Sequence, residues 1–258
     1  MEAYERLEKI GEGQFGRVFR GRRRFTGQFC ALKFLPKAQQ SPAALAALRG
    51  EVAILQRLAH PNVVRLLDFF ETHEDVVLVT ELCVGELFEV LTSDGALAPA
   101  AMAAVARELT RALAYLHGAG VMHRDLKPQN VLIGAGGAVK LADFGFAKET
   151  SHELISSIKG TPLYMAPEMF TEERYGPSAE VWGLGVLLFE LATGRPPFFA
   201  ATLPELMKAI TDEAPLEFPP ALPASLVDFL SQCLRREPAA RPPFAALLAH
   251  PYIAADLN

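Results

Sequence analysis

The sequence predicts an α+β domain of two lobes that spans residues 1–258. In residues 1–80 the apolar pattern is mostly short and alternating, which is typical of a small antiparallel β-sheet. In residues 86–258 apolar residues recur at helical spacing, which predicts a larger, mostly helical lobe. Half of the 258 residues are apolar, enough to bury a sizeable core. We expect the two lobes to join at residues 81–85.

Each element of the two lobes follows from a local pattern. In the first lobe, alternation at 17–20 and 29–35 predicts strands, and helical spacing between Pro42 and Leu58 predicts one main helix. The apolar run 76–81 ends before a break at Gly85. In the second lobe we expect helices over three segments, which are 102–117, 179–191 and Leu226 to the C-terminus.

Charge and composition exclude several classes of function. The formal net charge of -5 and the pI of about 5.7 provide no positive field for nucleic acid or an anionic membrane. The N-terminus is charged where a signal peptide needs an apolar core, and the longest apolar run, 181–191, is interrupted by Glu190. The three cysteines lie far apart, without metal-ligand spacing. We therefore expect a cytoplasmic protein with free thiols.

A glycine-rich segment, Gly11-Glu12-Gly13-Gln14-Phe15-Gly16-Arg17-Val18, is the first candidate for a ligand site. Glycines let backbone N–H groups approach phosphate oxygens closely. A dinucleotide-binding loop would open a helix and be followed by an acidic residue about twenty positions later, whereas here the loop leads into an alternating strand. The pattern predicts a hairpin that covers phosphates. A plain tight turn stays open for the motif taken alone.

Lys33 lies mid-strand between apolar neighbours, where an unpaired ammonium group would be costly to bury. Glu51, within the predicted helix, can supply one anionic partner, and nucleotide phosphates can supply the other. A surface lysine that extends its head into water is the alternative for this residue alone.

The strongest signal is His123-Arg124-Asp125-Leu126-Lys127-Pro128-Gln129-Asn130, which lies between an apolar helix and an apolar strand. Asp125 can accept a hydroxyl proton, Lys127 can stabilise a transferring phosphoryl group, and Asn130 can hold Mg²⁺. Asp143, at the end of the next strand, adds a hard oxygen ligand, although a surface Asp-Gly turn would give the same local pattern.

Together with Ala166-Pro167-Glu168 and Arg241, these motifs resemble the eukaryotic protein kinase family over essentially the whole chain. Lys127 and the segment 160–164 resemble its serine/threonine branch. Four further segments, 85–88, 127–130, 143–147 and 157–165, resemble Fused kinases, close to the unc-51-like group.

The resemblance implies ATP and Mg²⁺ as cofactors. It implies a catalytic set of Asp125 as base with Lys127, Asn130, Lys33 and Glu51, in which Asn130 and Asp143 bind the metal. It implies a nucleotide site that comprises Ile10, Gly11, Glu12, Gly13, Gln14, Phe15, Gly16, Arg17, Val18, Ala31, Lys33, Thr80, Glu81, Cys83, Leu132 and Asp143. In this site Val18, Ala31 and Leu132 enclose adenine, and the backbone of Glu81 and Cys83 pairs with its edge.

The resemblance also assigns structural roles. Thr80 is the expected gatekeeper, and Glu168 and Arg241 are the expected ion pair that anchors the activation segment, 143–168. A stack that aligns the lobes is expected from Leu55, Leu66, His123 and Phe144. One departure is Glu180, where the family usually has Asp; the shorter side chain normally accepts N–H bonds from the catalytic turn, so the glutamate leaves full activity in doubt.

The expected substrate is a protein hydroxyl group. Phe146 lies where the family contacts the acceptor, so we expect serine in preference to threonine. Phosphorylation of Ser156 or Ser157, by an upstream kinase or by the protein itself, is expected to order the activation segment through Arg124. By family resemblance the protein could associate with the cytoskeleton or cilium. The rival readings are a pseudokinase-type scaffold or binding module and, less well supported, a small-molecule kinase or dinucleotide enzyme.

Overall fold

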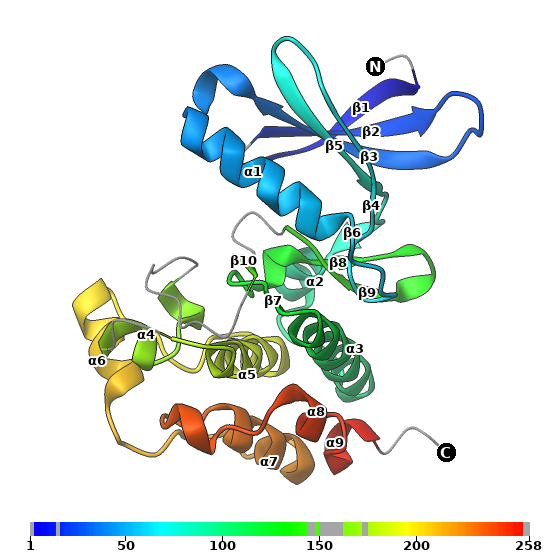
Figure 1. The fold of residues 1–258 in the computed structure, drawn as a ribbon. Helices are drawn as coiled ribbons and strands as arrows, with labels where there is room; N and C mark the ends of the chain where they lie inside the picture. The colour runs from blue at the N-terminus through cyan, green and yellow to red at the C-terminus, as the bar shows by residue number, and fades with distance from the viewer. Residues whose placement is uncertain (1–2, 14–15, 144–147, 150–161, 172–174, 255–258) are drawn as a thin grey trace.

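The structure, a computed structural model, describes residues 3–13, 16–143, 148–149, 162–171 and 175–254. Figure 1 shows a small lobe of strands and one long helix above a larger lobe of helices. The small lobe contains a five-stranded antiparallel sheet in the order β1-β2-β3-β5-β4. Its strands are β1 (Tyr4–Gly13), β2 (Gly16–Arg23), β3 (Phe29–Pro36), β4 (Leu66–Glu71) and β5 (Asp75–Glu81). The predicted α+β fold of two lobes is confirmed.

Strand alternation divides β3 between two environments. Cys30, Leu32 and Phe34 are buried in one apolar cluster, whereas Ala31 and Lys33 face the other side of the sheet. Ala31 is paired with Thr80 and Lys33 with Val18 and Leu78, so these residues share one face. The period of two therefore places the side chains predicted to contact nucleotide on the same surface.

Helix α1 (Pro42–Leu55) packs against the sheet through an apolar side. The Ser41 hydroxyl accepts the Ala44 N–H at 3.1 Å, and Pro42 occupies the first turn, as expected for a helix start. The helix ends at Leu55 rather than at Leu58, because the next N–H groups bond three residues back and tighten the chain into a turn. The predicted main helix is confirmed with this correction.

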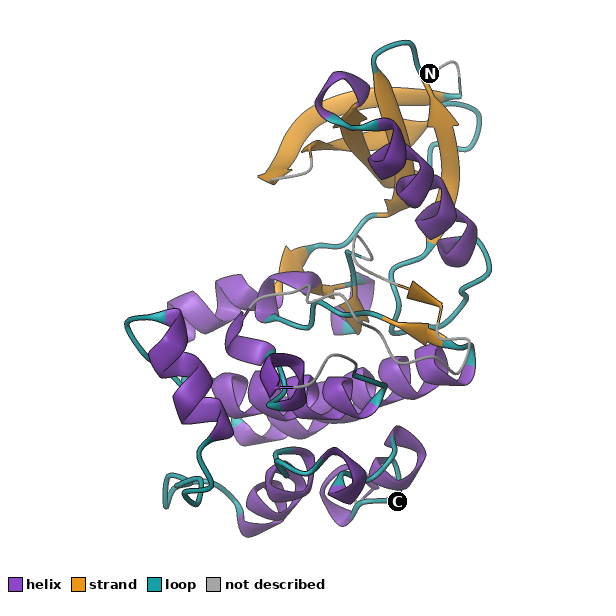
Figure 2. Cartoon of the chain, turned by 60° about the vertical axis from the view of Figure 1, so that its left-hand side comes forward, coloured by secondary structure: helices purple, strands orange, loops and turns teal. Residues whose placement is uncertain are grey.

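The large lobe is built around α5 (Ser178–Thr193), which is buried along most of its length. It contacts α3 (Pro99–Gly118) and α7 (Ala224–Cys233). Figure 2 shows the helices of this lobe gathered below the small-lobe sheet. The region after Leu226 is not one helix, since prolines divide it. The remaining helices are α2 (Leu87–Asp94), α4 (Glu168–Thr171), α6 (Leu203–Thr211), α8 (Phe244–Leu247), α9 (Pro251–Ala254) and the 3-10 turns η1 (Lys37–Gln39), η2 (Pro128–Asn130), η3 (Ala135–Gly137), η4 (Pro162–Tyr164) and η5 (Pro238–Ala240).

Five short strands form two small sheets at the top of the large lobe. They are β6 (Gly85–Glu86), β7 (Val121–Met122), β8 (Val131–Ile133), β9 (Val139–Leu141) and β10 (Lys148–Glu149), paired as β6-β8-β9 and β10-β7. The segment between β7 and β8 carries Asp125, Lys127 and Asn130, and Asp143 follows β9; the other two predicted catalytic residues, Lys33 and Glu51, lie in the small lobe. Within the described residues, no helix has the length and apolarity needed to cross a bilayer.

Candidate active site

The loop between β7 and β8 is fixed from within by His123. This side chain is fully buried; Nε2 lies 2.8 Å from the Ala142 carbonyl oxygen, and Nδ1 lies 3.3 Å from the Asp125 amide nitrogen. A carbonyl only accepts and an amide N–H only donates, so these partners assign the ring proton to Nε2. His123 therefore holds the backbone on both sides of the site, which agrees with its expected structural role.

Asp125 is the centre of a polar group formed by three predicted catalytic residues. The Asp125 Oδ2 atom accepts from Lys127 Nζ at 2.6 Å and from Asn130 Nδ2 at 2.9 Å. The same Asn130 nitrogen also donates to the Asp125 carbonyl oxygen at 2.7 Å. The turn η2 closes this arrangement by bringing Asn130 back toward the loop. One cation and one amide therefore hold a largely buried carboxylate in a single orientation.

Lys33 and Asp143 link the two lobes. Lys33 Nζ lies 3.0 Å from Asp143 Oδ1, and both side chains are partly exposed. Asp143 has φ of 59°, a left-handed conformation that is unusual for a residue with a side chain. The structure therefore brings the predicted phosphate-binding lysine to the predicted metal-binding carboxylate. Glu51 lies in α1, but its side chain is outside the described part of the chain, so its pairing with Lys33 stays a prediction.

The glycine segment forms the end of the β1–β2 hairpin. Gly13 is paired with Gly16, and β2 follows directly, so no helix begins at the glycines as a dinucleotide-binding loop would require. A Cβ atom on Gly16 would lie 2.0 Å from the Phe34 carbonyl oxygen, which only glycine avoids. Gln14 and Phe15 lie outside the described residues. The remaining predicted members are Ile10, Gly11, Glu12, Arg17 and Val18, all on these two strands.

The predicted adenine pocket uses both lobes. Ala31 and Val18 come from the sheet, and Leu132 comes from β8. The Glu81 carboxylate points to other partners, since Oε1 accepts from Arg65 N–H at 2.8 Å and from Lys140 Nζ at 3.0 Å. Its predicted contact with the nucleotide therefore depends on its backbone alone.

Comparison with known proteins decides the family. The family described as protein kinase domain matches residues 4–253 of the chain. The chain belongs to the protein kinase family. The order of its motifs and the geometry of Lys33, Asp125, Asn130 and Asp143 agree with this membership.

Several protein kinases are similar along almost the whole chain. Serine/threonine-protein kinase 36 of Pongo abelii is 45% identical over 260 residues, which cover 100% of this chain and 20% of that protein. Serine/threonine-protein kinase TIO of Arabidopsis thaliana is 44% identical over 98% of this chain and 19% of its own length. Serine/threonine-protein kinase fused of Drosophila melanogaster is 36% identical over 98% of this chain and 32% of its own length. The predicted resemblance to Fused kinases is confirmed, and the chain spans a fifth to a third of these relatives.

In this kinase domain Glu180 reaches the catalytic turn despite the substitution. Glu180 Oε1 accepts the Arg124 N–H at 2.6 Å, and Oε2 lies 2.6 Å from His117 Nε2 at the end of α3. His117 is held in turn by edge-on contact with the Phe244 ring. Burial alone would raise the pKa of Glu180, but His117 and the Arg124 N–H together hold it below its usual value. The extra methylene is accommodated because α3 supplies a partner for the second oxygen.

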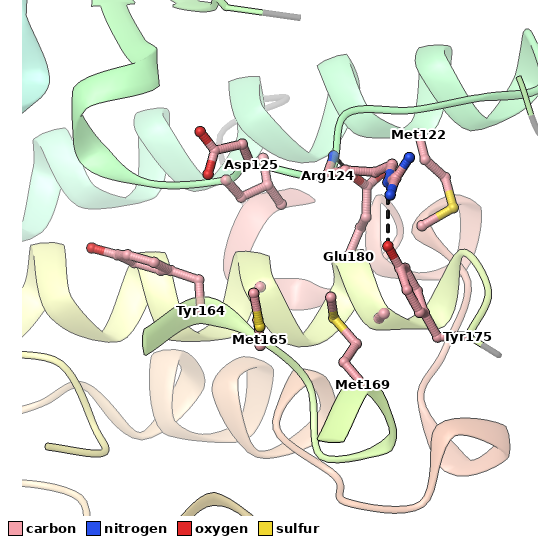
Figure 3. A pocket seen from close by; sticks show the side chains of 11 residues that line it. Met122, Arg124, Asp125, Tyr164, Met165, Met169, Tyr175 and Glu180 are labelled. Carbon is pink, nitrogen blue, oxygen red and sulfur yellow. Dashed lines mark hydrogen bonds between the residues drawn. The ribbon is translucent and has the colours of Figure 1, made fainter. Parts of the chain in front are cut away.

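The Arg124 side chain also has a partner. Its Nε donates to the Tyr175 hydroxyl at 3.2 Å, as Figure 3 shows. One donor of Arg124 is therefore taken by a neutral hydroxyl group, and its expected contact with a phosphate of the activation segment, which lies outside the described residues, stays a prediction. The pair borders a cavity of about 30 Å³ whose other lining residues include Met122, Met165 and Met169. This volume suits one or two water molecules and is too small for a substrate side chain.

Glu168 and Arg241 form the expected buried ion pair. Arg241 Nη1 and Nη2 donate to the two Glu168 carboxylate oxygens at 2.6 and 2.8 Å. The remaining donors of Arg241 bond to the carbonyl oxygens of Arg235, Ser178 and Arg236. All five N–H groups of this guanidinium are therefore satisfied, which a buried arginine requires.

The predicted stack between the lobes is only partly described. Leu55 is buried and Leu66 packs against the same apolar cluster, while Phe144 lies outside the described residues. Three polar residues around the site were not predicted: His117, Tyr175 and Lys140. Their partners lie far away in the sequence, and no local spacing signals them. Phe146, Ser156 and Ser157 also lie outside the described residues, so the predictions that rest on them stay untested.

Proposed function

We propose that this kinase domain transfers the γ-phosphoryl group of ATP to serine or threonine hydroxyl groups of proteins. The observation that carries the proposal is that Lys127 and Asn130 hold the Asp125 carboxylate in one orientation. Beside it, Lys33 of the small lobe pairs with Asp143 of the large lobe. The relatives are named serine/threonine-protein kinases, which supports the same activity.

The side chains present fit a magnesium nucleotide. Both hydrogen bonds of Asn130 described above use Nδ2, so its amide oxygen is available as a ligand. Together with the Asp143 carboxylate it offers the hard oxygen donors that Mg²⁺ prefers. When bound, Mg·ATP would supply the phosphoryl group and neutralise part of its charge. The glycines at the end of the β1–β2 hairpin leave backbone N–H groups without neighbouring side chains, which suits close approach to phosphate oxygens.

The chain's own residues would divide the work of the reaction. The Asp125 carboxylate would receive the proton of the attacking hydroxyl group and hold that oxygen in line. The Lys127 ammonium group, already beside Asp125, would balance negative charge on the transferring group. Lys33 would exchange its contact with Asp143 for the nucleotide phosphates.

A phosphotransfer assay tests the proposal against a pseudokinase-type scaffold. Purified domain is incubated with labelled ATP, Mg²⁺ and a generic basic protein, beside the variant Asp143→Asn. We expect transfer that requires Mg²⁺ and falls by roughly a hundredfold or more in the variant, because positioning of the phosphates is lost. Nucleotide binding by the wild type without any transfer would establish the scaffold instead.

We further propose serine as the preferred acceptor, because Phe146 follows the Asp143-Phe144-Gly145 motif with a bulky side chain. A methyl group on the acceptor would compete for that space. A peptide library with serine or threonine at the acceptor position measures the preference. Equal or greater use of threonine would contradict it.

Phosphorylation of Ser156 or Ser157, by an upstream kinase or by the domain itself, is proposed to raise activity. The segment 150–157 contains no large aromatic residue and is rich in polar groups, so a phosphate could fix it through basic neighbours. The test compares kcat of phosphatase-treated protein with that of the variant Ser156→Ala/Ser157→Ala after mapping of sites by mass spectrometry. Full activity of the dephosphorylated double variant would refute this switch.

A further inference from the structure

A second cavity lies at the open end of the small-lobe sheet, away from the active site. Strands β1 and β4 are the two edges of this sheet, and Tyr4 joins them: its hydroxyl donates to Asp68 at 2.9 Å and its ring stacks on Phe70. The cavity has a volume of about 280 Å³. It is lined by Tyr4, Arg23, Gln28, Cys30, Arg65, Leu66 and Leu67. The mouth of a closed or nearly closed sheet is a common position for a ligand site.

Two guanidinium groups border this cavity without a carboxylate partner. Within the described residues, neither Arg23 nor Arg65 forms an ion pair, whereas Arg22 of the same hairpin pairs with Glu5 at 2.7 Å. Two acids lie close to the cavity, and both have other partners. The oxygens of Asp68 accept from the Tyr4 hydroxyl and the Phe69 N–H, and the Glu81 carboxylate accepts from the Arg65 backbone N–H and from Lys140. In the part of the chain that the structure describes, no carboxylate is therefore ion-paired with either guanidinium group at the cavity.

Hydrogen bonds fix the backbone that carries the two arginines. The Arg23 N–H donates to the Gln28 carbonyl at 2.8 Å, and the Gly27 N–H donates to the Arg23 carbonyl at 2.8 Å, with Gly27 at φ of 71°. Arg65 exchanges two hydrogen bonds with Glu81, at 2.8 and 3.0 Å. Because the backbone of both segments is fixed before any ligand arrives, the entropy lost on binding is limited to that of the two side chains.

The chemistry of the lining selects a phosphate monoester. Two guanidinium groups match its charge of nearly two and its oxygen geometry, and the Gln28 amide can add a donor. Beside the cavity, the hairpin tip carries Phe25, which is 94% exposed and can pack on apolar parts of a bound chain. Figure 1 shows that this β2–β3 turn projects at the end of the sheet opposite the link to α1. The net charge of -5 disfavours an anionic bilayer, which would face a large area of the domain, more than a single phosphate on one short segment.

We propose that this cavity binds a phosphorylated serine or threonine side chain within an extended segment of a partner protein, held by Arg23 and Arg65. Binding requires no turnover, so the inference stands independently of the proposed phosphoryl transfer. Occupancy would place a partner at the opposite end of the β1–β2 pair from the glycine hairpin.

Fluorescence anisotropy tests this site with a labelled peptide of alternating Gly and Leu around a central phosphoserine, so that the phosphate is the only anionic side chain. A non-hydrolysable ATP analogue with Mg²⁺ is present in excess to fill the nucleotide site. We expect Arg23→Gln/Arg65→Gln to weaken binding at least about tenfold, since two charge-assisted contacts are lost. The matched control Arg22→Gln/Arg24→Gln removes the same charge from the same hairpin and should change affinity by less than about twofold. The serine peptide without phosphate should bind at least about tenfold more weakly.

Three results would overturn the proposal. The two double variants could lose affinity equally, which would indicate a general charge effect. The serine peptide could bind as well as the phosphopeptide. Vesicles that contain a phosphoinositide could bind in an Arg23- and Arg65-dependent manner while the peptide does not, which would assign a lipid headgroup. Melting temperatures establish that each variant is folded, and the single surface variant Arg23→Gln replaces the double variant if that one is unstable.

Discussion

At position 180 a buried carboxylate joins the end of α3 to the backbone of the catalytic turn. The two oxygens of Glu180 are divided between His117 and the Arg124 N–H, each at 2.6 Å. An aspartate at this position would be shorter by one methylene group. It could keep one of the two contacts without a shift of α5, which is closely packed along this side.

Glu180→Asp should therefore lower activity. We expect kcat to fall about tenfold or more with little change in the KM for ATP, because a lost hydrogen bond to a buried charged group costs about 1.5–3 kcal/mol and acts on the loop rather than on the nucleotide. Steady-state kinetics at saturating ATP measure the effect. A rise in kcat would show that the glutamate misplaces the loop. Glu180→Gln keeps the side-chain length but removes the charge, so it distinguishes the effect of side-chain length from the effect of charge.

The predictive power of the sequence at this scale depends on where the partner lies. Asp125, Lys127 and Asn130 fall within one short motif, so their local spacing alone predicted the group that the structure brings together. His117 and Glu180 are 63 residues apart, and nothing in either neighbourhood indicates the contact. Lys140 could be assigned to a strand, but its bond to Glu81 depends on how β9 meets the sheet.

At the scale of elements, one acidic side chain fastens α1 to the sheet. Glu71, the last residue of β4, accepts two hydrogen bonds from Arg49 of α1, at 2.9 and 3.2 Å. Lys37, in η1 before the helix, also pairs with Glu71 at 2.9 Å. Hydrogen bonds from Arg49 and Lys37 lower the pKa of Glu71 to about 2. The helix that carries Glu51 is thus fixed at its middle and near its start.

This pairing predicts a pH-dependent contribution to stability. Because the folded-state pKa of Glu71 is lowered from 4.5 to about 2, the contribution is complete above pH 4.5 and is lost as the pH falls toward 2. Glu71→Gln should therefore lower the urea midpoint at neutral pH, and the difference from wild type should shrink on acidification. Glu74→Gln, in the following turn, is the control. A difference that stays constant with pH would contradict the assignment.

The helices that were not predicted from the sequence, α2 and α6, are short. Helix α6 begins with a capping box, in which Thr202 and Glu205 exchange side-chain and backbone bonds, and this Thr-x-x-Glu signal is present in the sequence. Helix α2 has eight residues and follows a two-residue strand, so its apolar periodicity is too brief to stand out. The long helices α3 and α5 were predicted within a few residues, because their repeated apolar positions extend over several turns.

At the scale of the whole molecule, Arg241 connects segments that are far apart in the sequence. It pairs with Glu168 in α4, bonds to Ser178 at the start of α5, and lies 5.3 Å from the Trp182 ring centroid. Glu168, the last residue of the predicted activation segment, is thereby attached to the core of the large lobe. Lysine has a single ammonium group and cannot reproduce the hydrogen bonds that the planar guanidinium group makes in several directions.

Arg241→Lys should destabilise the folded protein by about 3 kcal/mol, since it leaves a buried carboxylate and several carbonyl groups without partners. Urea unfolding followed by fluorescence of Trp182, the single tryptophan, measures the change. Arg235→Lys, on an exposed side chain close by, is the matched control and should change stability by less than about 0.5 kcal/mol. Equal effects of the two substitutions would mean that the ion pair contributes nothing specific.

The two left-handed residues carry a consequence for engineering of this kinase domain. Within the described residues, Arg124 and Asp143 are the non-glycine residues with positive φ, and both flank the predicted reaction centre. Such a backbone costs roughly 1–2 kcal/mol per residue, so Arg124→Gly or Arg124→Asn would relieve strain in the turn that Glu180 holds. The same substitutions remove the contact with Tyr175 and loosen the turn beside Asp125. Laboratory evolution for heat resistance should therefore favour these substitutions, and selection for turnover should reverse them.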